Sequence, residues 1–191
     1  MTSIAVIVGS TREGSFNRAL GELAAASLET QGASVTRVDL ADFDLPLYSA
    51  ALEANAFPPD ALKLKALFAA QDGLLFVSPE YNGSLPPLLK NAIDWASRPT
   101  GDESLIALTA YRGKAASIMS ASLSPFGGLR GLMHLRQILS TIQMLVIPEQ
   151  VVVPGAHTAF AEDGSLKEAL PASLVEMTTG RLIAVAKALA A

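Results

Sequence analysis

The stretch Ile4–Asn17 reads IAVIVGSTREGSFN and joins a short apolar run to a turn rich in glycine, hydroxyl and amide side chains. A continuous apolar run that ends at a glycine predicts a buried parallel strand over Ile4–Val8. Apolar residues at helical spacing follow from Ser15 onward. A turn with this composition holds more hydrogen-bond donors than a plain strand-to-helix connection needs, so we interpret it as a phosphate-binding turn.

Apolar runs and helical patterns continue to alternate along the chain. Further strands are predicted at Ala33–Asp39, Gly73–Ser78, Lys114–Ser122 and Leu145–Val153. Helices are predicted at Ser15–Thr30, Asp60–Ala70, Leu88–Ser97, Arg130–Met144 and Ala172–Ala188, with irregular segments at Leu40–Pro59 and Arg98–Gly113. This alternation predicts one α/β domain over residues 1–191, a flavodoxin-like three-layer sandwich with a five-stranded parallel sheet of order 2-1-3-4-5. The second strand, short and less apolar, is expected near an edge, and the third at the centre.

The composition excludes several classes of function. A formal net charge of −4 argues against nucleic acid as the main partner, because phosphate backbones demand basic patches. No apolar run approaches the roughly 20 residues of a membrane helix. Cysteine is absent, which excludes disulfides and thiolate zinc sites and is compatible with the cytoplasm, the location that we expect. The acidic residues have no metal-ligand spacing, so no metal is expected. A hydrophobic content of 50% indicates subunit interfaces.

Three unusual connections follow the first, third and fourth predicted strands. Open parallel sheets bind ligands outside the carboxyl ends of their strands, where the strand order reverses. In the order 2-1-3-4-5 this crevice lies between strands one and three, beside strand four. The segments that end there are GSTREGSFN (residues 9–17), PEYNGS (79–84) and SASLSPFGG (120–128). Their coincidence at one crevice predicts a ligand site.

The first of these connections suits a dianionic monophosphate. Gly9 and Gly14 permit positive φ and close backbone approach, and Arg12 supplies a guanidinium. Side-chain donors are offered by Ser10, Thr11, Ser15 and Asn17. The pattern is neither a P-loop nor the Gly-x-Gly-x-x-Gly dinucleotide fingerprint. The alternative is an ordinary helix cap by Ser15 behind a flexible loop.

The second connection suits a flat ring. Tyr81 can lie against such a ring, while the main-chain N–H groups of Asn82 and Gly83 reach heteroatoms on its edge. The alternative is that Tyr81 covers the core and that Pro86–Pro87 only begin a helix. A planar cofactor with a phosphate tail satisfies the first two connections together, which describes flavin mononucleotide (FMN).

The segments GSTREGSFNRAL and SPEYNGSLPPLLKNAIDWASRP resemble the NADPH-dependent FMN reductase family of flavin, quinone, azo-dye and chromate reductases. The resemblance extends from Ile4 to about Pro154. It implies that the FMN phosphate is held by Ser10, Arg12, Ser15 and Asn17. It implies that the isoalloxazine ring is bordered by Pro79, Glu80, Tyr81, Asn82, Gly83 and Ser84. The connection SASLSPFGG departs from the more glycine-rich versions in the family, and we assign the far edge of the ring to Ser120, Ser122 and Gly127.

The predicted activity is hydride transfer from NADPH or NADH through flavin N5 to a small-molecule electron acceptor. The cofactor performs this chemistry, so no catalytic side chain is predicted. His134 and His157 are interpreted as structural or solvated. Nicotinamide and acceptor would use one open ring face in turn, which predicts ping-pong kinetics. The walls of this shared site are expected from Leu40–Pro59 and Arg98–Gly113, of the same chain or of a neighbouring subunit. The resemblance implies a homodimer or homotetramer.

The leading hypothesis is therefore an FMN-dependent NAD(P)H oxidoreductase that reduces quinones, free flavin or similar acceptors. One alternative is a flavodoxin-type electron carrier without its own NAD(P)H site, against which Arg12 and the modest charge argue. Another is a flavin-free regulatory or scaffolding domain, against which the donor-rich loops argue. The choice between NADH and NADPH stays open, since a 2′-phosphate has three candidate partners, Arg98, Arg112 and Arg130.

Overall fold

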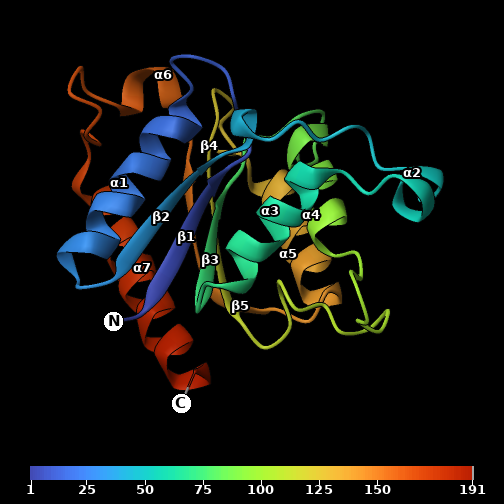
Figure 1. Cartoon of the computed structure of the whole chain (residues 1–191). Coiled ribbons are helices and arrows are strands. Elements are labelled where there is room, and N and C mark those ends of the chain that lie inside the picture. The colour runs from blue at the N-terminus through green and yellow to red at the C-terminus, as the bar shows by residue number, and fades with distance from the viewer. Residues whose placement is uncertain (191) are drawn as a thin grey trace.

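The computed structural model describes residues 1–190 and contains one parallel sheet of order β2-β1-β3-β4-β5 (Figure 1). The strands are β1 (Ser3–Val8), β2 (Ser34–Asp39), β3 (Gly73–Val77), β4 (Ala115–Ala121) and β5 (Leu145–Val153). The helices are α1 (Phe16–Thr30), η1 (Leu40–Asp42, a 3₁₀ turn), α2 (Ala50–Asn55), α3 (Pro59–Ala69), α4 (Pro87–Ala96), α5 (Leu129–Thr141), α6 (Ala156–Ala159) and α7 (Ala169–Leu189). The predicted strand order is confirmed.

Helices cover both faces of the sheet, as Figure 1 shows for α1 and α7 on one side and α3, α4 and α5 on the other. Successive residues of a strand point to opposite faces, so each central strand supplies two cores. Ile7 and Phe76 pack in the core under α3, α4 and α5. Val6 and Leu75 pack in the core under α1 and α7. Burying apolar residues on both faces explains why the central strands read as continuous apolar runs.

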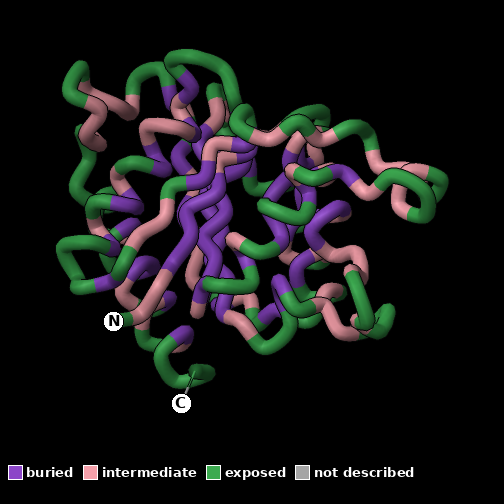
Figure 2. Tube along the Cα trace, viewed as in Figure 1, coloured by how far each residue is buried: buried purple, intermediate pink, exposed green. Residues whose placement is uncertain are grey.

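The sequence correctly placed the central and edge strands. Every residue of β3 is buried, whereas β2 pairs with β1 alone and has one buried residue, Val38, the others being half-buried or exposed (Figure 2). The left-handed Gly32, with a φ of 85°, follows the end of α1, because glycine adopts this conformation without strain.

Some predicted boundaries were wrong. Residues 40–59 are not one irregular loop, because they contain η1 and α2; Asp39 caps η1 by accepting a hydrogen bond from the Ala41 N–H at 3.0 Å. The last helix begins at Ala169 and not at Ala172, since a proline is tolerated in a first turn that needs no N–H donor, and Pro171 stands there. The short helix α6 was not predicted, and α5 ends before the left-handed Gln143.

The two long excursions occupy different places. The segment 40–59 packs along α4, where the Trp95 indole donates to the Pro46 carbonyl at 2.7 Å and the Tyr48 N–H donates to Asn91 Oδ1 at 2.8 Å. The segment 98–113 joins the end of α4 to the start of β4, so it lies at the amino ends of the strands. It therefore cannot wall a crevice at the carboxyl ends within the same chain, which corrects that expectation. Within residues 1–190, no helix is both long and apolar enough to cross a membrane.

Candidate active site

The three predicted connections meet at the carboxyl edge of the sheet. Hydrogen bonds continue the strand ladder beyond β1, β3 and β4: the Gly9 N–H donates to the Val77 carbonyl at 2.8 Å, and the Ser78 N–H donates to the Met119 carbonyl at 2.9 Å. The Ser122 N–H likewise donates to the Val153 carbonyl at 3.0 Å. The loops are thus anchored side by side, and we call them the first loop (residues 9–17), the second loop (79–84) and the third loop (120–128).

The first loop presents hydrogen-bond donors that the rest of the protein does not use. Among the described residues, no acceptor bonds the main-chain N–H groups of Thr11, Phe16 and Asn17. Ser15 stands at the N-cap of α1, yet its side chain makes no capping hydrogen bond. The interpretation as an ordinary cap therefore gains no support, and the free N–H groups at the start of α1 suit an anion.

Arg12 lies exposed on this loop. Within residues 1–190, its one hydrogen bond is to the neighbouring Glu13 carbonyl at 3.2 Å, so no carboxylate engages its guanidinium. Arg18, by contrast, is paired with Asp39 at 2.6 Å. Arg12 is therefore available to an incoming anion in a way that Arg18 is not.

Asn17 has a structural role that the sequence analysis did not assign. Its side chain is buried, donates to the Ala121 carbonyl at 2.8 Å and accepts from the Ala121 N–H at 3.0 Å. This pair of bonds holds the start of α1 against the end of β4. The predicted contact of Asn17 with a phosphate stays a prediction, and its free main-chain N–H is the group best placed for it.

The second loop ends in a two-residue reversal. The N–H of Tyr81 donates to the Ser84 carbonyl at 2.8 Å, and the Ser84 N–H donates back at 3.0 Å. Asn82 and Gly83 both have positive φ, 51° and 81°, which is the geometry of a type I′ turn. A Cβ on Gly83 would meet nothing within 4 Å, so its φ and not close packing within the chain requires glycine there.

Tyr81 and the tip of this turn face solvent. Tyr81 is 50% exposed, which contradicts the alternative that it covers the core. Within the described chain, the main-chain N–H groups of Asn82 and Gly83 have no acceptor. An aromatic ring and two free donors thus lie together, as a flat ligand with polar edges requires.

The flanking residues of the second loop bind α5. Glu80 accepts from Arg130 Nε at 2.8 Å and from the Gly131 N–H at 3.2 Å, and Ser84 Oγ lies 3.0 Å from His134 Nδ1. Burial alone would raise the pKa of Glu80, but the bonds from Arg130 and Gly131 bring the pKa below its ordinary value. The carboxylate is therefore ionised and turned into the protein. Pro79 is half-buried at the start of the loop, and His157, like His134, is exposed.

The third loop is packed more tightly than the sequence suggested. Ser120 is fully buried, its hydroxyl has no partner among residues 1–190, and a Cβ on Gly128 would come 1.9 Å from it. Gly128 therefore has to be glycine, a requirement that the Gly-Gly pair at residues 127–128 indicates in the sequence. A Cβ on Gly127 would lie 3.0 Å from the Pro154 nitrogen. Ser122 is half-buried and accepts from the Ser124 N–H at 3.2 Å. The predicted contact of Ser120 with the isoalloxazine ring stays a prediction. The burial of its side chain does not favour it.

Three arginines were considered as partners for the 2′-phosphate of NADPH, and one of them lies at the carboxyl edge of the sheet. Arg98 and Arg112 belong to the excursion at the amino ends of the strands, while Arg130 lies in the first turn of α5 beside the second loop.

The donor set fits FMN. Unpaired N–H groups and a free guanidinium on the first loop match a phosphate, and the exposed Tyr81 with two free N–H groups matches a flavin ring. Such loops at the carboxyl edge of a 2-1-3-4-5 sheet are those of a flavodoxin-like FMN-binding protein.

Within that class, the chain belongs to the NADPH-dependent FMN reductase family, whose model matches residues 2–158. It is 36% identical over 171 residues to an NAD(P)H-dependent FMN reductase of Pseudomonas aeruginosa, covering 89% of this chain and 87% of the relative. It is 40% identical over 151 residues to a 2-hydroxy-1,4-benzoquinone reductase of Burkholderia sp., covering 78% and 77%. Among solved structures, FerB, a flavoenzyme NAD(P)H:(acceptor) oxidoreductase from Paracoccus denitrificans, matches with a TM-score of 0.83 and 28% identity over 98% of both chains.

These findings confirm the predicted family and class. The protein is an FMN-dependent NAD(P)H oxidoreductase. The family resemblance based on residues 9–20 and 78–99 was therefore correct. The two alternatives, an electron carrier without a nicotinamide site and a flavin-free domain, have no support from the family.

Proposed function

We propose that the protein reduces quinones and similar small acceptors with NAD(P)H, using FMN bound between the three loops. The observation on which this rests most is the donor set of the first loop, unpaired within the described chain and at the same edge as the half-exposed Tyr81. Relatives that are named quinone reductases support the class of acceptor; one from Pseudomonas putida is 37% identical over 172 residues.

The residues divide into three roles. Ser10, Arg12, Ser15 and the N–H of Asn17 would hold the phosphate, because charge-assisted and main-chain hydrogen bonds suit a dianion. Tyr81 would lie against the ring while the N–H groups of Asn82 and Gly83 orient its polar edge. The ring border would be completed by Pro79, Glu80 and Ser84 from the second loop and by Ser120, Ser122 and Gly127 from the third. When bound, FMN supplies the hydride-accepting chemistry, and the chain supplies position and electrostatics.

An anaerobic visible spectrum tests this proposal directly. Purified protein, loaded with FMN if necessary, should show flavin bands that bleach on addition of NADH or NADPH and return on addition of 1,4-benzoquinone. Initial rates at several quinone concentrations should give parallel double-reciprocal lines, as ping-pong kinetics require. Protein that takes up no FMN would refute the proposal, and intersecting lines would refute the ping-pong order alone.

We also propose a homodimer or homotetramer in the cytoplasm. Apolar side chains exposed around the third loop and the first turns of α5 support an interface, namely Leu123 (63%), Phe126 (58%) and Met133 (63%). A cysteine-free sequence supports a reducing compartment. Light scattering after size exclusion should give two or four times the chain mass of 19.9 kDa, and a monomer would contradict the proposal.

A further inference from the structure

Arg130 touches both loops that border the proposed ring site. Its Nε donates to Glu80 Oε1 at 2.8 Å, and Nη2 donates to the same oxygen. Its guanidinium carbon lies 5.3 Å from the centre of the Phe126 ring, within the range of a cation–π contact. Glu80 precedes Tyr81 on the second loop, and Phe126 belongs to the third. One side chain thus joins the two loops.

The carboxylate that Arg130 binds is shielded from solvent. The Glu80 side chain is 5% exposed, whereas that of Arg130 is 56% exposed. Glu80 also accepts from the Gly131 N–H at 3.2 Å, and so caps α5, whose own N-cap residue is the side-chain-free Gly128. A buried charge is tolerated only when it is paired and hydrogen-bonded, so losing the guanidinium would release Glu80 from its place.

The second loop is closely packed against the first turns of α5. A Cβ on Gly131 would lie 3.1 Å from the Ser84 carbonyl oxygen and 3.4 Å from the Cβ of Glu80. One turn further along α5, His134 Nδ1 lies 3.0 Å from Ser84 Oγ. The first turns of α5 therefore pack against the turn of residues 81–84, which contains Tyr81.

We propose that Arg130 is a positioning residue for the flavin site, which fixes the spacing between the second and third loops through Glu80 and Phe126. This inference rests on the proposed function, because it assumes that FMN lies between these loops. An exposed ion pair is usually worth little, but here the planar guanidinium bonds a buried carboxylate and stacks on a ring at once. Lysine would keep the charge and lose the stacking.

The test compares Arg130→Met and Arg130→Lys with Arg136→Met, a matched control on the same helix. Arg136 donates to the Ile147 carbonyl at 2.8 Å and to Gln150 Oε1 at 3.0 Å, away from the loops. FMN affinity is measured by fluorescence titration of flavin-free protein, the visible bands of bound flavin are recorded at saturation, and thermal unfolding is followed in parallel.

We expect Arg130→Met to bind FMN about tenfold more weakly, with shifted flavin bands, since a charge-assisted contact of about 1.5 kcal/mol is lost from the loop support. Arg130→Lys should fall between this variant and the wild type, and Arg136→Met should stay within about twofold whatever its stability. The double variant Glu80→Gln/Arg130→Met should weaken FMN binding by less than the product of the two fold-changes of the single variants, because both substitutions remove the same contact.

Wild-type affinity and unshifted bands in Arg130→Met would overturn the inference while leaving the proposed function intact. An equal loss in Arg136→Met would also overturn it, because general destabilisation would then explain both. Failure of the wild type itself to bind FMN would refute the proposed function instead.

Discussion

At the scale of single residues, the first loop separates side chains that face solvent from side chains that hold the fold. Arg12 is exposed and has no carboxylate partner within the described chain, whereas Asn17 is buried and bonded twice to Ala121. Ser10 and Ser15 are each 5% exposed and are therefore buried nearly as far as Asn17, which is 4% exposed. Substitutions at Arg12 and Asn17 should therefore affect different properties, binding in one case and stability in the other.

Replacing Arg12 with alanine should weaken FMN binding by about 10- to 100-fold, because a charge-assisted hydrogen bond is worth roughly 1.5–3 kcal/mol. The free energy of unfolding should stay unchanged, since the side chain supports nothing in the fold. Fluorescence titration with FMN measures the first and urea unfolding the second. Arg112→Ala, an exposed arginine at the opposite end of the sheet, is the control, and equal losses in both would show that Arg12 acts only through net charge.

Replacing Asn17 with alanine should lower the free energy of unfolding by about 2–3 kcal/mol, because two hydrogen bonds are lost and the Ala121 main-chain groups lose a buried partner. Urea unfolding measures this change. Asn55→Ala removes an exposed amide on α2, bonded only to the Ala51 carbonyl at 2.9 Å, and should change stability by less than about 0.5 kcal/mol. Equal effects at both positions would contradict the structural role of Asn17.

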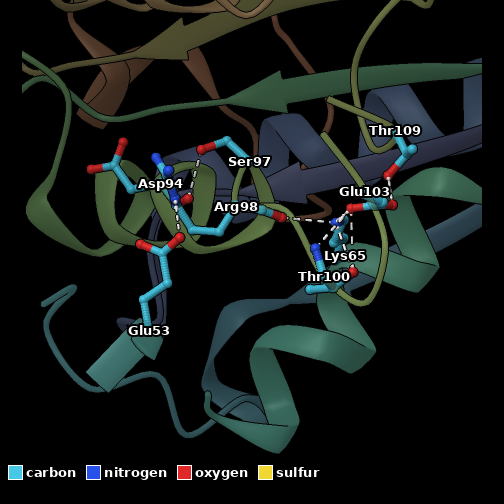
Figure 3. A network of polar contacts seen from close by, with 8 residues as sticks. All are labelled: Glu53, Lys65, Asp94, Ser97, Arg98, Thr100, Glu103 and Thr109. Carbon is cyan, nitrogen blue, oxygen red and sulfur yellow. Dashed lines mark hydrogen bonds and ion pairs between the residues drawn. The ribbon is translucent and has the colours of Figure 1, made fainter. Parts of the chain in front are cut away.

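At the scale of elements, polar contacts tie the excursions to α3 and α4 (Figure 3). Arg98, after α4, binds Glu53 at 3.0 Å and lies 5.7 Å from the centre of the Tyr48 ring. Lys65 of α3, whose side chain is 7% exposed, donates to the Arg98 carbonyl at 2.7 Å and forms an ion pair with Glu103. The two excursions thereby form one body with the helices on that face of the sheet.

Glu103→Gln should destabilise the protein at pH 7 by about 2 kcal/mol, less than the roughly 3–5 kcal/mol of a fully broken buried pair, because glutamine still accepts hydrogen bonds. Although burial alone would raise it, the bonds from Lys65, Thr109 and Thr100 bring the pKa of Glu103 from 4.5 to about 2. A lowered folded-state pKa contributes stability above the unfolded pKa and loses it as the pH falls toward the folded one.

The difference in urea midpoint between wild type and Glu103→Gln should therefore shrink as the pH falls from about 5 to about 2. Asp102→Asn, at the exposed neighbouring residue, is the control and should change stability at pH 7 by less than about 0.5 kcal/mol. If the difference in urea midpoint stayed constant over this pH range, the contact with Lys65 would not lower the pKa of Glu103, which would contradict the prediction.

In the whole molecule, a hydrophobic core on each face stabilises the sheet, and the first, second and third loops are hydrogen-bonded to the ends of its strands. Gly9 and Ser78 extend the ladder between β1, β3 and β4, and the strands before them are buried on both faces. A ligand at this edge contacts loops from three strands at once. Its binding should therefore stabilise the folded domain as a unit.

Saturation with FMN should raise the thermal midpoint. At 100 times the dissociation constant, linkage gives about 2.7 kcal/mol, which corresponds to about 5–10 °C for a domain of this size. Differential scanning fluorimetry or calorimetry of flavin-free and flavin-loaded protein measures the shift, and Arg12→Ala at the same FMN concentration should shift less. An unchanged midpoint at saturation would mean that FMN does not bind the folded site preferentially.

The sheet, the strand order and the flavin-binding class were predictable from the sequence, because hydrophobic periodicity and glycine-rich turns are local properties. The strands and their order came from the alternation along the whole chain, while the turn GSTREGSFN and the residues Tyr81, Asn82 and Gly83 indicated FMN. Residues near in sequence make these elements, so their pattern can be read without knowledge of the fold.

The loop side chains that stabilise the fold could be identified only once the packed domain was known. The bonds of Asn17 to Ala121 and of Glu80 to Arg130 join residues 104 and 50 positions apart, so no local pattern could reveal them. The burial of Ser120 under Gly128 likewise depends on how α5 packs. The place of residues 98–113 at the amino ends of the strands, by contrast, follows from the order of the elements, because this segment runs from the end of α4 to the start of β4. Contacts between distant residues are set by packing, and packing is a property of the assembled domain.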